Sequence, residues 1–156
     1  MYLGEEQWRH GLALPLPHEL VFVFRNGKQG HRNNVQLGRF GRNRTNVWNY
    51  AGANSFPRKG RRSGLDLHPT VKPIAMVTDA ILDSTKRNDV VLDPFCGSGT
   101  TILAAEQTGR RGYCLEIDPL YVDTAIERWQ NITRQQARHA SGETFAEIKA
   151  KRRPTP

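Results

Sequence analysis

Residues 89–109 constrain the fold more than any other part of this chain, because they combine a strand, a glycine turn and a helix. Residues 89–93, Asp-Val-Val-Leu-Asp, form a short β-branched run typical of a buried strand. Glycines follow at 97 and 99, and residues 100–107 have the composition of a helix that Gly109 ends. A glycine adopts positive φ readily and has no Cβ. The sequence therefore predicts a sharp turn whose main-chain amides can contact a ligand.

A second strand with an acidic end is predicted at 111–117, Arg-Gly-Tyr-Cys-Leu-Glu-Ile. In an open α/β sheet, acidic residues at the carboxyl end of a strand face the ligand crevice, and Glu116 occupies that position. Taken alone, Glu116 is read as an ordinary solvated acid at a strand end. Beside the glycine turn, it is read as a ligand-binding residue.

Three kinds of ligand are compatible with a strand, a glycine turn and a helix. A phosphate-binding P-loop needs Lys after its last glycine, where this chain has Thr100. A dinucleotide fold needs a third glycine, where this chain has Ile102. A ligand with ribose hydroxyls, an amino-acid tail and no phosphate needs neither residue, and Glu116 would accept hydrogen bonds from its hydroxyls. The third interpretation is favoured, and the dinucleotide interpretation stays open as an alternative.

Three motifs in a fixed order make the prediction more specific. They are His68-Pro-Thr-Val-Lys-Pro73, Asp93-Pro-Phe-Cys-Gly-Ser-Gly-Thr-Thr101 and Gly112-Tyr-Cys-Leu-Glu-Ile-Asp-Pro-Leu-Tyr121. Their order and spacing, over about residues 18–130, resemble the cofactor half of the DNA amino-methyltransferases. The position of the cofactor motifs at the carboxyl end resembles the β class.

The resemblance implies a Rossmann-like α/β sheet that binds S-adenosylmethionine. It also implies that the intact enzyme, of the restriction-modification kind, transfers a methyl group to an exocyclic amino nitrogen of adenine or cytosine in double-stranded DNA. By the same resemblance, Thr70 and Lys72 meet the methionine end of the cofactor, the 97–99 turn lines it, and Glu116 holds its ribose. The cofactor-binding set is then Thr70, Lys72, Pro73, Asp93, Phe95, Cys96, Gly97, Ser98, Gly99, Thr100, Glu116 and Ile117.

The family's methyl-transfer motif is missing from this sequence. That motif is Asp, Asn or Ser followed by Pro-Pro and an aromatic residue, and the chain contains no Pro-Pro pair. In the β class the motif lies on the amino-terminal side, so we expect a truncated domain that begins past it, with catalytic residues unknown. Asp118-Pro-Leu-Tyr121 differs from the motif at one position. The capping preferences of Asp and Pro, and the apolar spacing of Val122, Ile126, Trp129 and Ile132, favour a helix start there.

Positive charge is concentrated in one segment. The chain has 23 Lys and Arg against 15 Asp and Glu, and residues 25–65 hold ten of the basic residues and no acidic one. Gly, Asn and Arg dominate this stretch with little apolar periodicity, which predicts a loop-rich basic arm at about 25–66. Such side chains suit phosphates, base edges and unpaired bases, although a solvated basic loop is the alternative. The DNA-binding candidates are Arg32, Asn34, Arg39, Arg42, Arg44 and Trp48.

Length and composition predict a single domain over residues 1–156, with its cofactor-binding part at about 67–140. No apolar run is long enough for a membrane helix and no signal peptide opens the chain, so we expect a cytoplasmic protein. Cys96 and Cys114 have no zinc or disulfide spacing, and no metal site is expected. A core strand is predicted at 17–24, ended by a turn at 25–28, and a helix at 73–86. Residues 131–140 could prolong the helix that starts near Asp118, and 149–156 are read as a frayed basic end.

Without the catalytic strand, the sheet is expected to be incomplete and the strand that ends at Asp93 to have an unpaired edge. We therefore expect the chain to form a homodimer, to pair with a missing amino-terminal catalytic segment, or to be poorly stable alone. Two other functions stay open. One is a non-catalytic remnant that binds DNA and cofactor, and the other is a dinucleotide-binding enzyme.

Overall fold

The computed structural model describes residues 19–28, 30–35, 38–39, 41–51 and 71–152. The chain divides into two units, residues 1–31 and 32–156. In the first unit the described residues form neither helix nor strand, and Gly27, with φ of +85°, lies at a bend. The second unit contains all the helices and strands described below.

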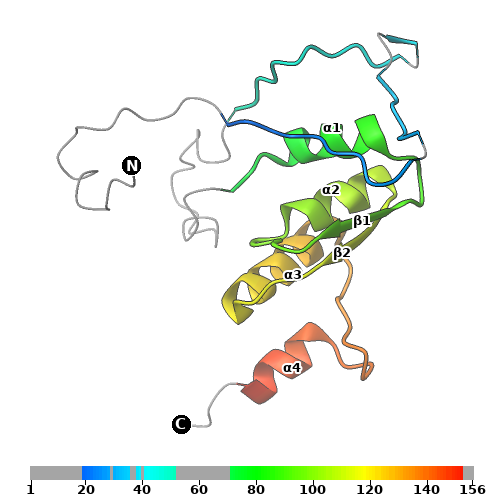
Figure 1. The fold of residues 1–156 in the computed structure, drawn as a ribbon. Coiled ribbons are helices and arrows are strands. Elements are labelled where there is room, and N and C mark those ends of the chain that lie inside the picture. Colours follow the sequence, from blue (N-terminus) through cyan, green and yellow to red (C-terminus); the bar gives the residue numbers. More distant parts are fainter. Residues whose placement is uncertain (1–18, 29, 36–37, 40, 52–70, 153–156) are drawn as a thin grey trace, which may run out of the picture. The chain divides into compact units, whose positions relative to one another are not determined.

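The centre of the second unit is a strand–helix–strand unit (Figure 1). Strand β1 (Val90–Asp93) and strand β2 (Arg111–Cys114) pair in parallel, with Val90 opposite Arg111 and Asp93 opposite Cys114. Helix α2 (Thr100–Thr108) connects them and is ended by Gly109, whose φ is +66°. The α/β fold class, both strands and this helix confirm the sequence prediction, although β2 ends earlier than expected.

Helices α1 (Ile74–Ser84) and α3 (Pro119–Thr133) both pack on α2. The buried apolar residues are small or branched, and alanines dominate them, so the helix backbones approach closely. These core residues are Ile81, Leu103, Ala104, Ala105 and Ala125. The helix predicted at 73–86 is therefore confirmed as α1, with Pro73 at its N-cap instead of in its first turn.

The start of α3 confirms the capping interpretation of Asp118. Its carboxylate accepts a hydrogen bond of 2.9 Å from the amide of Leu120, and Pro119 is the first helical residue. The buried face differs from the predicted one: only Ala125 is buried, whereas Ile132 is 46% exposed. A small residue is selected because α3 lies against the backbone of the glycine turn, where a large side chain does not fit.

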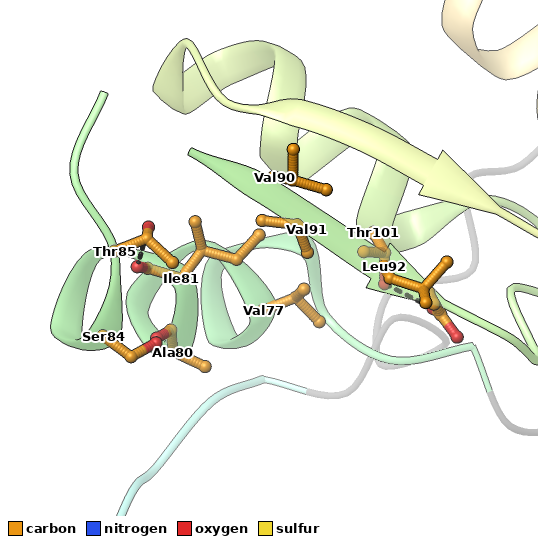
Figure 2. Close-up of a pocket in the computed structure, with 10 residues that line it drawn as sticks. Val77, Ala80, Ile81, Ser84, Thr85, Val90, Val91, Leu92 and Thr101 are labelled. Atoms are coloured by element: carbon orange, nitrogen blue, oxygen red, sulfur yellow. Dashed lines mark hydrogen bonds between the residues drawn. The ribbon is translucent and has the colours of Figure 1, made fainter. Parts of the chain in front are cut away.

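The described residues leave one face of the two-stranded sheet without a cover. Alternate residues of a strand point to the same face, and Val90, Leu92, Tyr113 and Leu115 are all more than half exposed. Helix α1 and strand β1 border an open groove of about 330 Å³, where Figure 2 shows Val77, Ile81 and Val91 along its wall. Within the described ranges only β2 pairs with β1. Among the described residues, the second edge of β1 is therefore unpaired, as expected.

The prediction of a core strand at 17–24 is wrong for the part that the structure describes. Residues 19–24 form no strand, and the side chains from Leu20 to Phe24 are between 65% and 87% exposed. Phe22 and Phe24 contact each other at a centroid separation of 6.4 Å. The composition favours a strand, but a strand forms only when a neighbour supplies hydrogen bonds and a covering surface. No described segment supplies them here.

The carboxyl-terminal predictions also require correction. Helix α3 stops at Thr133, because Arg134 adopts a left-handed φ of +62°, so it does not extend to 140. A further helix, α4 (Phe145–Arg152), includes residues 149–152, which are the described part of the segment read as a frayed end. Its signal was the capping box that starts at Thr144. The amide of Thr144 donates to Glu147 at 2.7 Å, and the amide of Glu147 donates back to the Thr144 hydroxyl at 3.3 Å.

Candidate functional site

The turn between β1 and α2 is held by hydrogen bonds from its own amides. Asp93 accepts from the amide of Phe95 at 3.0 Å and from the hydroxyl of Thr101 at 2.6 Å. The amide of Cys96 donates to the carbonyl of Leu115 at 3.0 Å, which joins the turn to the segment after β2. Asp93 therefore stabilises the turn from inside.

The two glycines of the turn have different reasons to be glycine. A Cβ on Gly97 would have no atom within 4 Å, so this position faces open space. A Cβ on Gly99 would lie 2.6 Å from the Cβ of Ala125 on α3. Both residues have positive φ, +53° and +82° respectively. Of the two, only Gly97 keeps a surface open to a ligand, whereas Gly99 permits helix packing.

Glu116 lies beside this turn, as the strand-end argument predicted. One of its carboxylate oxygens, Oε2, accepts a hydrogen bond of 2.7 Å from the amide of Gly97. The other, Oε1, accepts from the amides of Ile117 and Asp118, each at 3.0 Å. The carboxylate thus joins the segment after β2 to the turn after β1, and it lies between the two.

A cleft of about 550 Å³ opens at this junction. Large apolar side chains stand exposed beside the acid: Phe95 is 90% exposed and Ile117 is 98% exposed. An apolar wall next to a hydrogen-bonding carboxylate is typical of a small-molecule site. The cleft is lined by Pro94, Phe95, Gly97, Leu115, Glu116, Ile117 and Tyr121.

The structure brings some of the twelve cofactor candidates to this cleft and places others behind it. Phe95, Gly97, Glu116 and Ile117 line the cleft. Ser98, Gly99 and Thr100 are buried in the turn and at the start of α2, and Cys96 is half-buried. The hydroxyl of Thr100 lies 3.4 Å from the carbonyl of Lys72, which it reaches as a hydrogen-bond donor. Lys72 and Pro73 therefore adjoin the turn, and Thr70 lies outside the described residues.

One residue that supports the turn was missed by the sequence analysis. Arg128 of α3 donates to the carbonyl of Ser98 at 2.5 Å and to its hydroxyl at 2.7 Å. Burial lowers the pKa of this guanidinium below its usual range. An arginine on an amphipathic helix gives no sequence signal for such a role, because the contact joins residues 30 positions apart.

The DNA-binding candidates of the basic arm divide into exposed residues and residues that contact other parts of the protein. Arg32 and Arg39 are exposed. Arg42 and Arg44 form ion pairs with Asp79 and Asp83 of α1. Asn34 donates to the carbonyls of Leu82 and Thr85, and the guanidinium of Arg44 covers the ring of Trp48 at 4.3 Å from its centroid. The described part of the arm contains no α-helix or strand.

Cys96 and Cys114 lie next to each other behind the turn, and both thiols are free. Burial raises the pKa of Cys96, and it raises the pKa of Cys114 to about 12. The described ranges contain no group of three or more His, Cys, Asp or Glu side chains placed to hold a metal ion. None of the helices in the described part is both long and apolar enough to cross a bilayer.

Comparison with known proteins decides the family. The family model described as DNA methylase, which covers the N6 and N4 methyltransferases, matches residues 14–127, well over half of the chain. The chain belongs to the DNA methylase family. The resemblance stated from the three motifs is therefore confirmed.

Individual DNA methylases match parts of the chain. The type II methyltransferase M.Cfr9I of Citrobacter freundii is 35% identical over 119 residues, which are 72% of this chain and 36% of that protein. The type II methyltransferase M.HinfI of Haemophilus influenzae is 38% identical over 86 residues, which are 55% of this chain and 24% of that protein. The crystal structure of an M1.HpyAVI–SAM complex is 44% identical over 40% of this chain and 30% of its own, with a TM-score of 0.39. This chain thus matches about a third of the length of M.Cfr9I and smaller shares of the other two proteins.

Proposed function

We propose that this chain is the cofactor-binding part of an S-adenosylmethionine-dependent DNA methyltransferase that acts on an exocyclic amino group of adenine or cytosine. The observation that carries the proposal is the hydrogen bond of 2.7 Å from the amide of Gly97 to the carboxylate of Glu116, in a cleft with an exposed apolar wall. Membership of the DNA methylase family supports it.

The residues of the cleft fit this cofactor. An ionised carboxylate only accepts hydrogen bonds, so Glu116 suits the hydroxyl donors of a ribose. Phe95 and Ile117 offer flat and branched apolar surfaces to an adenine ring, and Gly97 leaves room for the ligand next to the backbone. Lys72, next to the start of α2, would meet the carboxylate of the methionine tail. When bound, the cofactor supplies an electrophilic methyl group on a sulfonium.

The turn is poorly suited to phosphate, which argues against the dinucleotide alternative. Phosphate sites at glycine turns depend on several main-chain amides that point at the anion. Here the amides of Phe95, Cys96, Gly97 and Gly99 all donate to protein oxygens. Glu116 would also repel a phosphate at this position.

Double-stranded DNA is the proposed substrate, and the target base would be flipped out of the helix to expose its amino nitrogen. Exposed basic residues of the arm, Arg32 and Arg39 among them, would contact phosphates. The group that accepts hydrogen bonds from the base amine is expected on the family's Pro-Pro motif, which is absent from this sequence. A DNA-modifying enzyme of this kind would act in the cytoplasm.

The uncovered sheet would be completed by a partner. Val90, Leu92, Tyr113 and Leu115 expose apolar surface, and the second edge of β1 offers backbone hydrogen bonds. A segment that carries the catalytic strand, or a second copy of this chain, would cover them. Sedimentation and calorimetry of the isolated chain test this point. A monodisperse monomer that melts cooperatively would contradict it.

The cofactor assignment is tested by titrating the purified chain with labelled S-adenosylmethionine and, separately, with NAD, each with and without duplex DNA. We expect binding of S-adenosylmethionine only. Gly97→Val should obstruct the cleft, and Glu116→Ala should remove the ribose acceptor, so each should weaken binding at least tenfold. Glu127→Gln, a change at an exposed residue of α3, is the control. Unaltered affinity in both cleft variants would refute the assignment, and NAD binding would favour the dinucleotide alternative.

A further inference from the structure

Two aspartates of α1 bind two arginines of the basic arm in one charge cluster. Asp79 and Asp83 are four residues apart and therefore lie on the same face of the helix. Arg42 reaches Asp79 at 3.0 Å and donates from Nε to Asp83 at 2.8 Å. Arg44 lies 2.6 Å from Asp79 and 3.2 Å from Asp83. Each arginine thus contacts both carboxylates, and the two pairs of charges cancel.

Tyr50 of the arm joins this cluster. Its hydroxyl donates to Asp79 at 2.5 Å and accepts from Arg44 at 2.6 Å. Burial by itself would raise the pKa of Asp79, but the hydrogen bonds from Tyr50, Arg44 and Arg42 outweigh it and hold that pKa at about 2. The guanidinium of Arg44 also covers Trp48, whose ring meets that of Tyr50 edge-on at 6.5 Å. Side chains already engaged in this way are not available for phosphates or bases.

A second attachment lies at the carboxyl end of α1. The side-chain amide of Asn34 donates to the carbonyls of Leu82 and Thr85, at 2.7 and 2.8 Å, and its main-chain amide donates to the carbonyl of Asp83 at 2.9 Å. The last carbonyls of a helix have no partner within the helix, so an arm residue satisfies some of them here. The arm is therefore attached to α1 at two places.

We propose that Asp79 and Asp83 are positioning residues that clamp the arm onto α1, and that Arg42 and Arg44 bind these aspartates instead of DNA phosphates. The ion pairs are partly shielded, since side-chain exposure is 24% for Arg42, 16% for Arg44, 15% for Asp83 and 30% for Asp79. Paired charges in such a setting are expensive to separate, because each would lose a charge-assisted hydrogen bond. The DNA part of this inference rests on the proposed function, and the clamp itself does not.

The clamp has a consequence for the geometry of the site. Helix α1 packs on α2, and α2 begins at the glycine turn that lines the cleft. The arm residues Asn34, Arg42, Arg44 and Tyr50, which contact α1, are thus fixed relative to the cofactor cleft. A binding element that is ordered before the substrate arrives avoids the entropy cost of ordering it during binding.

Limited trypsin digestion of the whole chain tests the clamp, because both arginines are trypsin sites and remain in the variants. The double variant Asp79→Asn, Asp83→Asn keeps the shape of both side chains and removes their charge. In this variant we expect cleavage after Arg42 and Arg44 to be at least tenfold faster than in the parent chain. Mass spectrometry of the fragments measures both rates. Asp123→Asn, on α3, is the matched control. Equal cleavage rates in the parent and double variants would overturn the proposal.

Two further measurements keep the test decisive. If the double variant loses helix content by circular dichroism, the single variants Asp79→Asn and Asp83→Asn replace it. Each removes one carboxylate charge from the cluster and should speed cleavage after Arg42 and Arg44; parental cleavage rates in both contradict the clamp. The second measurement is the salt dependence of DNA binding. In the parent chain the aspartates bind Arg42 and Arg44 and keep them from phosphates. In the double variant, the logarithm of the DNA-binding constant should therefore fall more steeply with the logarithm of salt concentration, by up to about 1.8 in slope. An unchanged slope would show that the aspartates do not withhold these arginines from phosphates, and would refute the inference. A parent chain that binds no DNA would refute the proposed substrate, while digestion still tests the clamp.

Discussion

Arg128 holds Ser98 in the turn, with one guanidinium nitrogen 2.5 Å from the Ser98 carbonyl and 2.7 Å from its hydroxyl. Ser98 is 6% exposed and lies between the two glycines of the turn. The helix α3 thus fixes the turn through a side chain that never reaches the cleft. This contact gives α3 a role in holding the turn that its own sequence does not indicate.

Replacement of Arg128 by Met is expected to destabilise the chain by about 1–3 kcal/mol, because it leaves two buried polar groups of Ser98 without their donor. The same change should weaken S-adenosylmethionine binding severalfold through a displaced turn. Denaturant unfolding and ligand titration measure the two effects. Arg128→Lys, which keeps a donor, should recover part of both, and Arg134→Gln is the control. A Met variant with parental affinity would show that the contact does not position the turn.

The two glycines should differ sharply when each is replaced by Ala. Gly99→Ala places a Cβ 2.6 Å from Ala125 at a positive φ, so a loss of about 2–4 kcal/mol is expected. In Gly97→Ala the new Cβ meets no atom within 4 Å, so the positive φ alone should lower the free energy of unfolding by about 1 kcal/mol. Adding Ala125→Gly to Gly99→Ala should recover the steric share of the loss. Equal unfolding free energies for the two single variants would contradict the packing of α3 on the turn.

Acid should release the arm. The pKa of Asp79 is about 2 in the folded chain, below its usual value near 3.8. A depressed carboxyl pKa stabilises the folded form above the unfolded pKa, and the gain is lost as pH falls through the folded pKa. Trypsin cannot be used at such pH, so pepsin digestion or Trp fluorescence between pH 5 and pH 2 would follow the release. Asp79→Asn should remove most of this pH dependence, and a parental profile in that variant would exclude Asp79 as its source.

The two cysteines should be unreactive in the folded chain. Thiolates are the nucleophilic form, and burial raises the pKa of Cys114 to about 12 and that of Cys96 above its usual value. Alkylation by iodoacetamide at pH 8 should therefore be far slower than for a free thiol and should reach the normal rate in denaturant. Labelling of either residue at the free-thiol rate in native buffer would show that the turn opens readily.

Local patterns predicted much of the fold around the site. The strand, turn and helix from Val90 to Thr108 follow from β-branched residues, glycines and a terminal glycine, all of which act on their immediate neighbours. The start of α3 follows from the capping chemistry of Asp118 and Pro119. Glu116 was placed correctly beside the turn because parallel strands end at a common edge. The capping box at Thr144 was equally local and could have been recognised.

Contacts between distant residues were decided only by the tertiary structure. The sequence marks Gly97 and Gly99 alike, and only the packing of Ala125 separates a cleft residue from a packing residue. Arg42 and Arg44 have the composition of phosphate contacts, yet Asp79 and Asp83, about 40 residues away, bind them. The run from Leu20 to Phe24 has strand propensity but no neighbour in the described structure. Propensity and capping act within a few residues, whereas pairing and burial depend on which surfaces the folded chain brings together.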